Sequence, residues 1–101
     1  MKLSEAILEG CKNTIQGFGS ESMYSSTFPC VLGAALLGVN IQVGVKNGYF
    51  LLREQFKELK QLERHPILYI NRTLISIIYD LNDRYRWSRE KIADWLVDKG
   101  Y

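Results

Sequence analysis

The chain has 101 residues, a net charge of +2 and an apolar fraction of 47%. These values indicate one globular domain, residues 1–101, and the small positive charge gives little support to a dedicated nucleic-acid-binding protein. The longest apolar run, residues 28–39, is too short to span a bilayer, which takes about twenty residues. The acidic Glu5 argues against a signal peptide, so we expect a cytoplasmic protein.

Cysteine and histidine are scarce. Cys11 and Cys30 are the only cysteines, and His65 is the only histidine. In a cytoplasmic chain the two cysteines are expected to be reduced core residues. One histidine and no CxxC pair cannot form a conventional zinc site, so we predict no metal and no cofactor.

The N-terminal third predicts a helix followed by a long loop. Ser4 is a suitable N-cap for the helix, with Leu3 and Leu8 as a hydrophobic staple. Residues 12–27 are polar and contain glycines, which favours a loop whose Phe18 enters the core. The loop lacks the third glycine and the flanking strand and helix of a dinucleotide-binding fingerprint.

The middle of the chain predicts a buried helix and a strand. Pro29 suits the first turn of a helix, and residues 30–37 are apolar on nearly every side. Apolar and polar residues then alternate over 39–46, the period of a half-buried strand, and Asn47-Gly48 follows as a turn. This strand would pair with part of 20–28, with residues near 49–52, or with a second subunit.

Three more helices are expected, over 50–62, 67–81 and 89–99. Pro66 separates the first two, since the residue before a proline resists the α conformation, and His65 is interpreted as a surface or capping residue at this junction. Ser88 is expected to cap the last helix, with Arg89 on its water-facing side. The predicted fold is therefore mainly α, a compact bundle of about five helices with a possible short strand or hairpin near 39–46.

The connection between the last two helices is the best candidate for an interaction surface. It combines cations, which suit phosphates, with rings that can stack on bases. The same residue types are enriched at protein-binding hot spots, and Tyr85, Arg86, Trp95 and Tyr101 could form such a patch. The candidate residues are Arg84, Tyr85, Arg86, Trp87, Arg89 and Lys91.

Residues 87–93 also echo the first helix of a helix-turn-helix, but no recognition helix follows within this sequence. Catalysis finds little support, because no serine or cysteine is tied to His65 by a known motif, and Asp80, Asp83 and Glu90 suit helix caps better than acid–base pairs. We therefore expect no enzyme, but a binding or regulatory module acting through a protein partner or self-association. The alternative is a weak nucleic-acid-binding protein using residues 84–91.

Four segments of the chain carry a resemblance: residues 3–7 (LSEAI), 30–35 (CVLGAA), 81–83 (LND) and 87–95 (WSREKIADW). Together they resemble a family of small uncharacterised bacterial helical proteins. Some members of that family carry a CxxC pair and two histidines around the LND segment, as in a zinc-finger-like site. Tyr79 and Tyr85 stand at the histidine positions here, so the resemblance implies a metal-free helical protein of bacterial origin and leaves the activity open.

Overall fold

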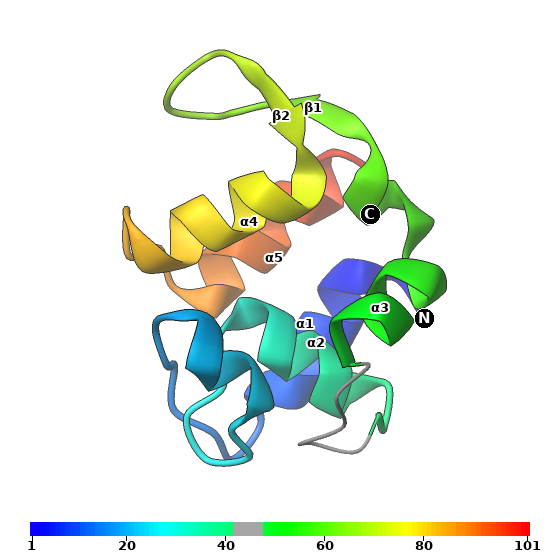
Figure 1. Ribbon diagram of the computed structural model, residues 1–101, viewed down its shortest axis with the longest axis vertical. Helices are drawn as coiled ribbons and strands as arrows, with labels where there is room; N and C mark the ends of the chain where they lie inside the picture. The colour runs from blue at the N-terminus through cyan, green and yellow to red at the C-terminus, as the bar shows by residue number, and fades with distance from the viewer. Residues whose placement is uncertain (42–47) are drawn as a thin grey trace.

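The structure, a computed structural model, describes residues 1–41 and 48–101. Within these ranges the chain forms five α-helices and one antiparallel pair of strands, which confirms the expected mainly α bundle with a short hairpin (Figure 1). The helices are α1 (Leu3–Cys11), α2 (Val31–Gly38), α3 (Gly48–Gln55), α4 (Leu74–Asp83) and α5 (Arg89–Asp98). The strands are β1 (Leu62–Arg64) and β2 (Asn71–Thr73), and two 3₁₀ helices are η1 (Ser20–Tyr24) and η2 (Lys57–Lys60).

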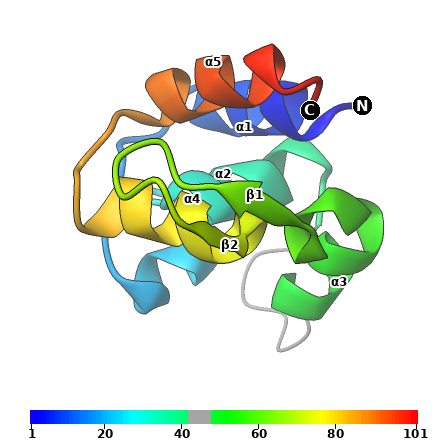
Figure 2. The same ribbon diagram turned by 90° about the horizontal axis from the view of Figure 1, so that it is seen from above.

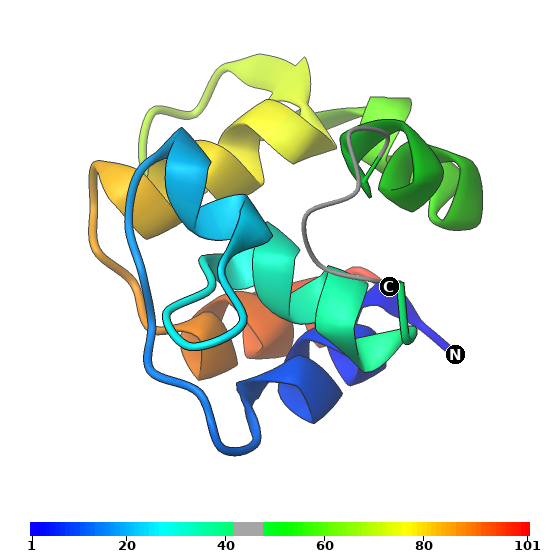
Figure 3. The same cartoon turned by 60° about the horizontal axis from the view of Figure 1, so that its bottom comes forward.

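The apolar helix α2 lies at the centre of the core. Nearly all of its side chains are buried, as its sequence predicted, and Cys30 caps it by accepting a hydrogen bond from the N–H of Gly33 at 3.5 Å. Helix α1 packs along α2, and α5 lies beside α1 (Figure 2). Helix α4 contacts α2 from the other side, so α2 is covered on both faces (Figure 3).

Glycines allow α1 and α2 to approach each other closely. A Cβ atom on Gly10 would lie 1.7 Å from the carbonyl oxygen of Ala34, and one on Gly38 would lie 1.9 Å from that of Ala6. Because neither space can hold a methyl group, both positions require glycine. Gly10 lies in the last turn of α1, and Gly38 is the last residue of α2.

Two expectations for the N-terminal part are wrong. Helix α1 begins at Leu3, before the expected N-cap Ser4, and the backbone N–H of Lys2 donates to Glu5 Oε1 at 2.6 Å. Leu8 is exposed, so the predicted hydrophobic staple does not form. Phe18 is also exposed, with the guanidinium of Arg86 4.0 Å from the centre of its ring. The loop around Phe18 is held through its backbone and Gln16 instead, which leaves the phenyl ring at the surface.

The loop before α2 is fixed by the side chain of Asn82, which is fully buried. Asn82 Oδ1 accepts from Gln16 Nε2 at 3.0 Å and from the N–H of Val31 at 3.1 Å. Its Nδ2 donates to the carbonyl of Gly17 at 3.1 Å and to Asp83 Oδ1 at 2.7 Å. One amide side chain therefore connects α4, the loop and the start of α2.

The strand expected over 39–46 falls mostly on residues 42–47, which lie outside the described residues. The described part does not form a strand: Val39 caps α2, Asn40 has a φ of 60°, and the N–H of Ile41 donates to the carbonyl of Leu36 at 3.0 Å. This is a turn that closes the C-terminal end of α2.

The hairpin lies instead at residues 62–73, where two helices were expected to meet. Leu62 pairs with Thr73, Glu63 with Arg72 and Arg64 with Asn71. The helix predicted over 50–62 stops at Gln55 and gives way to η2, and the helix predicted over 67–81 begins only at Leu74. The helical spacing of the apolar residues in 67–70 is therefore coincidental, because those residues form the turn of the hairpin. In contrast, α5 begins where predicted, with Ser88 Oγ accepting from the N–H of Lys91 at 3.0 Å.

No helix among the described residues combines the length and the apolar character needed to cross a bilayer.

Candidate functional site

The residues singled out between α4 and α5 do not share one surface. Arg84 lines a pocket beside the hairpin, and the ring of Tyr85 meets that of His65 edge-on, with centroids 5.8 Å apart. Arg86 stacks on Phe18 in the long loop. Trp87 is half-buried, with Lys91 Nζ 4.1 Å from its ring centre.

Arg89 is buried, with 4% of its surface exposed, so its predicted place on the water-facing side of α5 is wrong. Its Nη1 donates to Thr14 Oγ1 at 2.9 Å and to the carbonyl of Pro29 at 3.3 Å, and its Nη2 donates to the carbonyl of Thr14 at 2.9 Å. The backbone N–H of Arg89 also donates to Gln16 Oε1 at 3.2 Å. Arg89 thus fastens the loop to α5 and is not accessible to a partner.

His65, interpreted as a surface or capping residue, is not at the surface: its exposed fraction is 1%. His65 Nδ1 accepts hydrogen bonds from the backbone N–H groups of Ile67 and Leu68, both at 3.1 Å. An accepting nitrogen carries no proton, so the proton of the neutral ring is on Nε2, which donates to Asp80 Oδ2 at 2.6 Å. The backbone of His65 adds hydrogen bonds to Ile70 and Tyr69, at 2.8 and 3.0 Å.

These hydrogen bonds hold a turn that exposes three consecutive large apolar side chains. Leu68, Tyr69 and Ile70 have exposed fractions of 40%, 66% and 43%. Tyr69 has a φ of 57°, a conformation that costs a non-glycine residue roughly 1 kcal/mol or more. We call these three residues the hairpin tip; its apolar side chains point outward from a backbone that is hydrogen-bonded to His65.

The base of the hairpin is tied to the end of the chain. The hydroxyl of Tyr101 donates to Glu63 Oε1 at 2.5 Å, and Lys99 Nζ lies 3.5 Å from Glu63 Oε2. The hydrogen bond to Glu63 raises the pKa of the Tyr101 hydroxyl to about 12. Anchored at its base and at His65, the hairpin can present its tip in a defined position.

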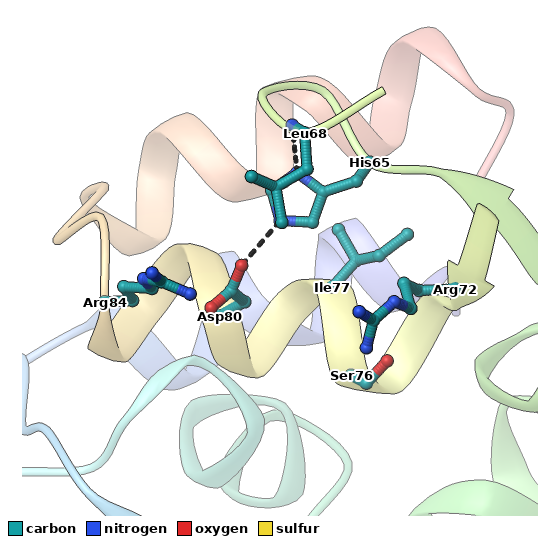
Figure 4. A pocket seen from close by; sticks show the side chains of 7 residues that line it. All are labelled: His65, Leu68, Arg72, Ser76, Ile77, Asp80 and Arg84. Atoms are coloured by element: carbon teal, nitrogen blue, oxygen red, sulfur yellow. Dashed lines mark hydrogen bonds and ion pairs between the residues drawn. The ribbon is translucent and has the colours of Figure 1, made fainter. Parts of the chain in front are cut away.

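A pocket of about 150 Å³ lies between the hairpin turn and α4. In Figure 4 the imidazole of His65 and the side chain of Leu68 stand over α4, with the carboxylate of Asp80 pointing toward the imidazole. The side chains of Arg72 and Arg84 approach from opposite ends (Figure 4). The lining residues are His65, Leu68, Arg72, Ser76, Ile77, Asp80 and Arg84, and we call this the α4 pocket.

Ser76, His65 and Asp80 have the composition of a hydrolytic triad but not its geometry. In such a triad one imidazole nitrogen faces the carboxylate and the other takes the proton of the serine. Here Nε2 of His65 donates to the carboxylate of Asp80, and Nδ1 accepts hydrogen bonds from two backbone N–H groups. The hydroxyl of Ser76 instead donates a hydrogen bond to the carbonyl of Thr73, at 3.0 Å. His65 therefore has no free nitrogen with which to act as a base.

Sequence reasoning missed the hairpin tip and the α4 pocket apart from Arg84. The signal that could have found them is the His65-Pro66 pair, because proline favours turns. Metal coordination has no support in residues 1–41 and 48–101, where no three His, Cys, Asp or Glu side chains gather. Comparison with family models, curated proteins and solved structures gives no match to this chain.

Proposed function

We propose that this protein is a non-enzymatic module that binds a protein partner through the hairpin tip. The observation that carries the proposal is the exposure of Leu68, Tyr69 and Ile70 on a turn whose backbone is fixed by the buried His65. Apolar side chains exposed together on a preorganised element are characteristic of binding sites, because little conformational entropy is lost when the partner docks.

The charges beside the hairpin tip favour an acidic partner. Arg64, Arg72 and Arg84 are exposed, and the guanidinium of Arg64 lies 5.6 Å from the ring centre of Tyr69. The nearby carboxylates are already engaged, Asp80 by His65 and Glu63 by Tyr101. A second copy of the chain related by two-fold symmetry would bring these arginines against one another, so a different protein with an apolar pocket rimmed by carboxylates fits better.

The absence of catalysis in this proposal is supported by the state of His65. Its Nδ1 accepts hydrogen bonds from the turn and its Nε2 donates to Asp80 on α4, so recruiting it as a base would disrupt the binding surface. The same residue therefore serves recognition by holding the tip in place.

A pair of matched variants tests the proposal. Tyr69→Ser removes the most exposed ring of the hairpin tip, while the control Tyr24→Ser removes an exposed ring on η1, far from the hairpin (Figure 1). Proteins captured from cell extract by the wild type are identified and purified, and their affinities for the three forms are measured by calorimetry. We expect Tyr69→Ser to weaken binding at least tenfold, about 1.4 kcal/mol, and Tyr24→Ser to leave it unchanged.

Equal affinity of all three forms would refute the hairpin tip as the binding surface. Self-association is tested separately by sedimentation velocity at high protein concentration. A dimer that dissociates in the Tyr69→Ser variant would show that the occupant of the tip is a second copy rather than another protein.

Nucleic-acid binding by residues 84–91 is less well supported, because Arg89 is buried and Arg84 faces the α4 pocket. Titration of isotope-labelled protein with single-stranded and duplex DNA at two salt concentrations separates the two functions. Phosphate contacts weaken steeply with salt, whereas apolar contacts do not. Salt-sensitive shifts confined to 84–91 would replace our proposal with this alternative.

A further inference from the structure

The α4 pocket presents two arginine side chains that the rest of the molecule does not use. Among the described residues, neither Arg72 nor Arg84 takes part in an ion pair or a side-chain hydrogen bond. The guanidinium of Arg84 makes a cation–π contact, with its carbon 5.8 Å from the ring centre of Tyr85. Both arginines nevertheless line the same pocket, to which Asp80 and the hydroxyl of Ser76 also contribute. Guanidinium groups that line one pocket and have no carboxylate partner are suited to bind an oxyanion.

The arrangement follows from the periodicity of α4. Ser76, Asp80 and Arg84 are four residues apart, so they follow one another along one face of the helix over about 12 Å. Arg72 precedes Ser76 by the same interval and reaches back from β2. The result is a cation at each end of the pocket and a carboxylate between them (Figure 4).

The net charge of the lining selects the kind of anion. His65 is neutral, because its Nδ1 accepts two hydrogen bonds, so two guanidinium groups and the Asp80 carboxylate give the lining a charge of +1. One carboxylate neutralises this charge. A phosphate group close to −2 would leave an excess negative charge beside Asp80, which costs free energy in a partly enclosed site.

We propose that the α4 pocket binds a single carboxylate between Arg72 and Arg84, and that this group is an acidic side chain of the protein partner. The second part rests on the proposed function, since the pocket adjoins the hairpin tip through Leu68, which belongs to both. A partner would then place an apolar group on the tip and a carboxylate in the pocket, and the two contacts together would fix its orientation.

The carboxylate site is tested on the isolated protein, without any partner. Acetate and methyl phosphate are titrated into labelled protein at constant ionic strength, with chloride as the reference salt, and amide shifts are followed for the pocket residues. Acetate should give saturable shifts with a Kd on the order of 1 mM. Arg72→Gln and Arg84→Gln should each weaken acetate binding about tenfold, because each removes a charged hydrogen bond.

The control Arg86→Gln makes the same change of charge two residues from Arg84 but outside the pocket lining, and it should bind acetate like the wild type. Equal weakening in all three variants would reveal a general charge effect and overturn the site. Absence of saturable shifts with acetate would do the same. Methyl phosphate binding tenfold tighter than acetate would overturn the assignment to a carboxylate.

The two proposals fail independently. The Tyr69→Ser variant should bind acetate like the wild type, because Tyr69 does not line the α4 pocket, while its affinity for the protein partner is reduced. An Arg72→Gln variant could lose acetate binding and still bind the purified partner as tightly as the wild type. That result would leave intact the proposal that the hairpin tip binds the partner. It would show that the partner's carboxylate does not occupy the pocket.

Discussion

Replacement of His65 by leucine should destabilise the protein by about 3 kcal/mol. The substitution keeps an apolar group of similar size in the buried space but removes three side-chain hydrogen bonds, to Ile67, Leu68 and Asp80. A neutral hydrogen bond contributes about 1 kcal/mol and one to a charged group about 1.5–3 kcal/mol. Water has partial access to the turn and to Asp80, which lowers the summed contribution of the three hydrogen bonds to about 3 kcal/mol.

His65→Asn provides a graded comparison. An asparagine side chain can accept hydrogen bonds from N–H groups two or three residues ahead, so it can replace Nδ1 at Ile67 and Leu68. It is too short to reach Asp80. We expect it to recover about 1 kcal/mol of the loss caused by His65→Leu.

Urea denaturation followed by circular dichroism gives the free energy of unfolding for the wild type and both variants. Hydrogen exchange of the Ile67 and Leu68 amides reports the turn directly, and exchange should be fastest in His65→Leu. A loss below about 1 kcal/mol for His65→Leu, with unchanged exchange at both amides, would refute the view that this ring holds the hairpin tip.

Three further predictions concern the core. Asn82→Ala removes four hydrogen bonds, two of them to backbone groups, and should lower the free energy of unfolding by about 3 kcal/mol. The exposed Asn71→Ala should change it by about 0.5 kcal/mol or less, and similar values for both would contradict the role of Asn82. Gly10→Ala places a methyl group against the backbone of α2 and should lower the free energy of unfolding by about 3 kcal/mol. The methyl group of Gly48→Ala meets only side-chain atoms, a leucine methyl at 3.3 Å and a tyrosine ring carbon at 3.5 Å, so this variant should be neutral or stabilising in thermal unfolding. Burial raises the pKa of the Cys11 thiol from 9.0 to about 11, so the stability that the protonated thiol contributes is complete below about pH 9 and lost as the pH rises through about 11. Alkylation of Cys11 at pH 9, mapped by mass spectrometry, should be far slower in the folded protein than in urea. Equal alkylation rates would exclude this pKa shift.

The helices whose ends carry local signals could be predicted from the sequence. Ser88 accepts the hydrogen bond expected of an N-cap, and the apolar run of α2 is buried as its composition required. The strands of the hairpin could not be predicted, because each has three residues, mostly polar and exposed, and lacks the alternation that identifies a strand; only its turn carries a local signal, the His65-Pro66 pair. The apolar residues of its turn happen to continue the spacing of α4.

At the candidate site, the burial of two polar side chains could not be predicted from the sequence either. Arg89 lies on a helix face that the sequence assigns to solvent, yet the loop around Thr14 and Gln16 covers it. His65 is buried because the hairpin folds it onto Asp80, fifteen residues later in the chain. Periodicity describes one element at a time, so it cannot identify a polar residue whose burial depends on a second element.

The reciprocal glycine contacts fix the rotation of α1 against α2 as well as their spacing. One residue inserted into either helix would turn everything after it by about 100° and bring a side chain to the place of Gly10 or Gly38. The backbone of the hairpin turn is fixed by His65, but the side chains of the hairpin tip are exposed and meet no such packing restriction. In chains that share this fold, insertions and deletions should therefore avoid residues 6–10 and 34–38, while substitutions should gather at 68–70, so that the part proposed to recognise a partner can change its side chains while the core cannot.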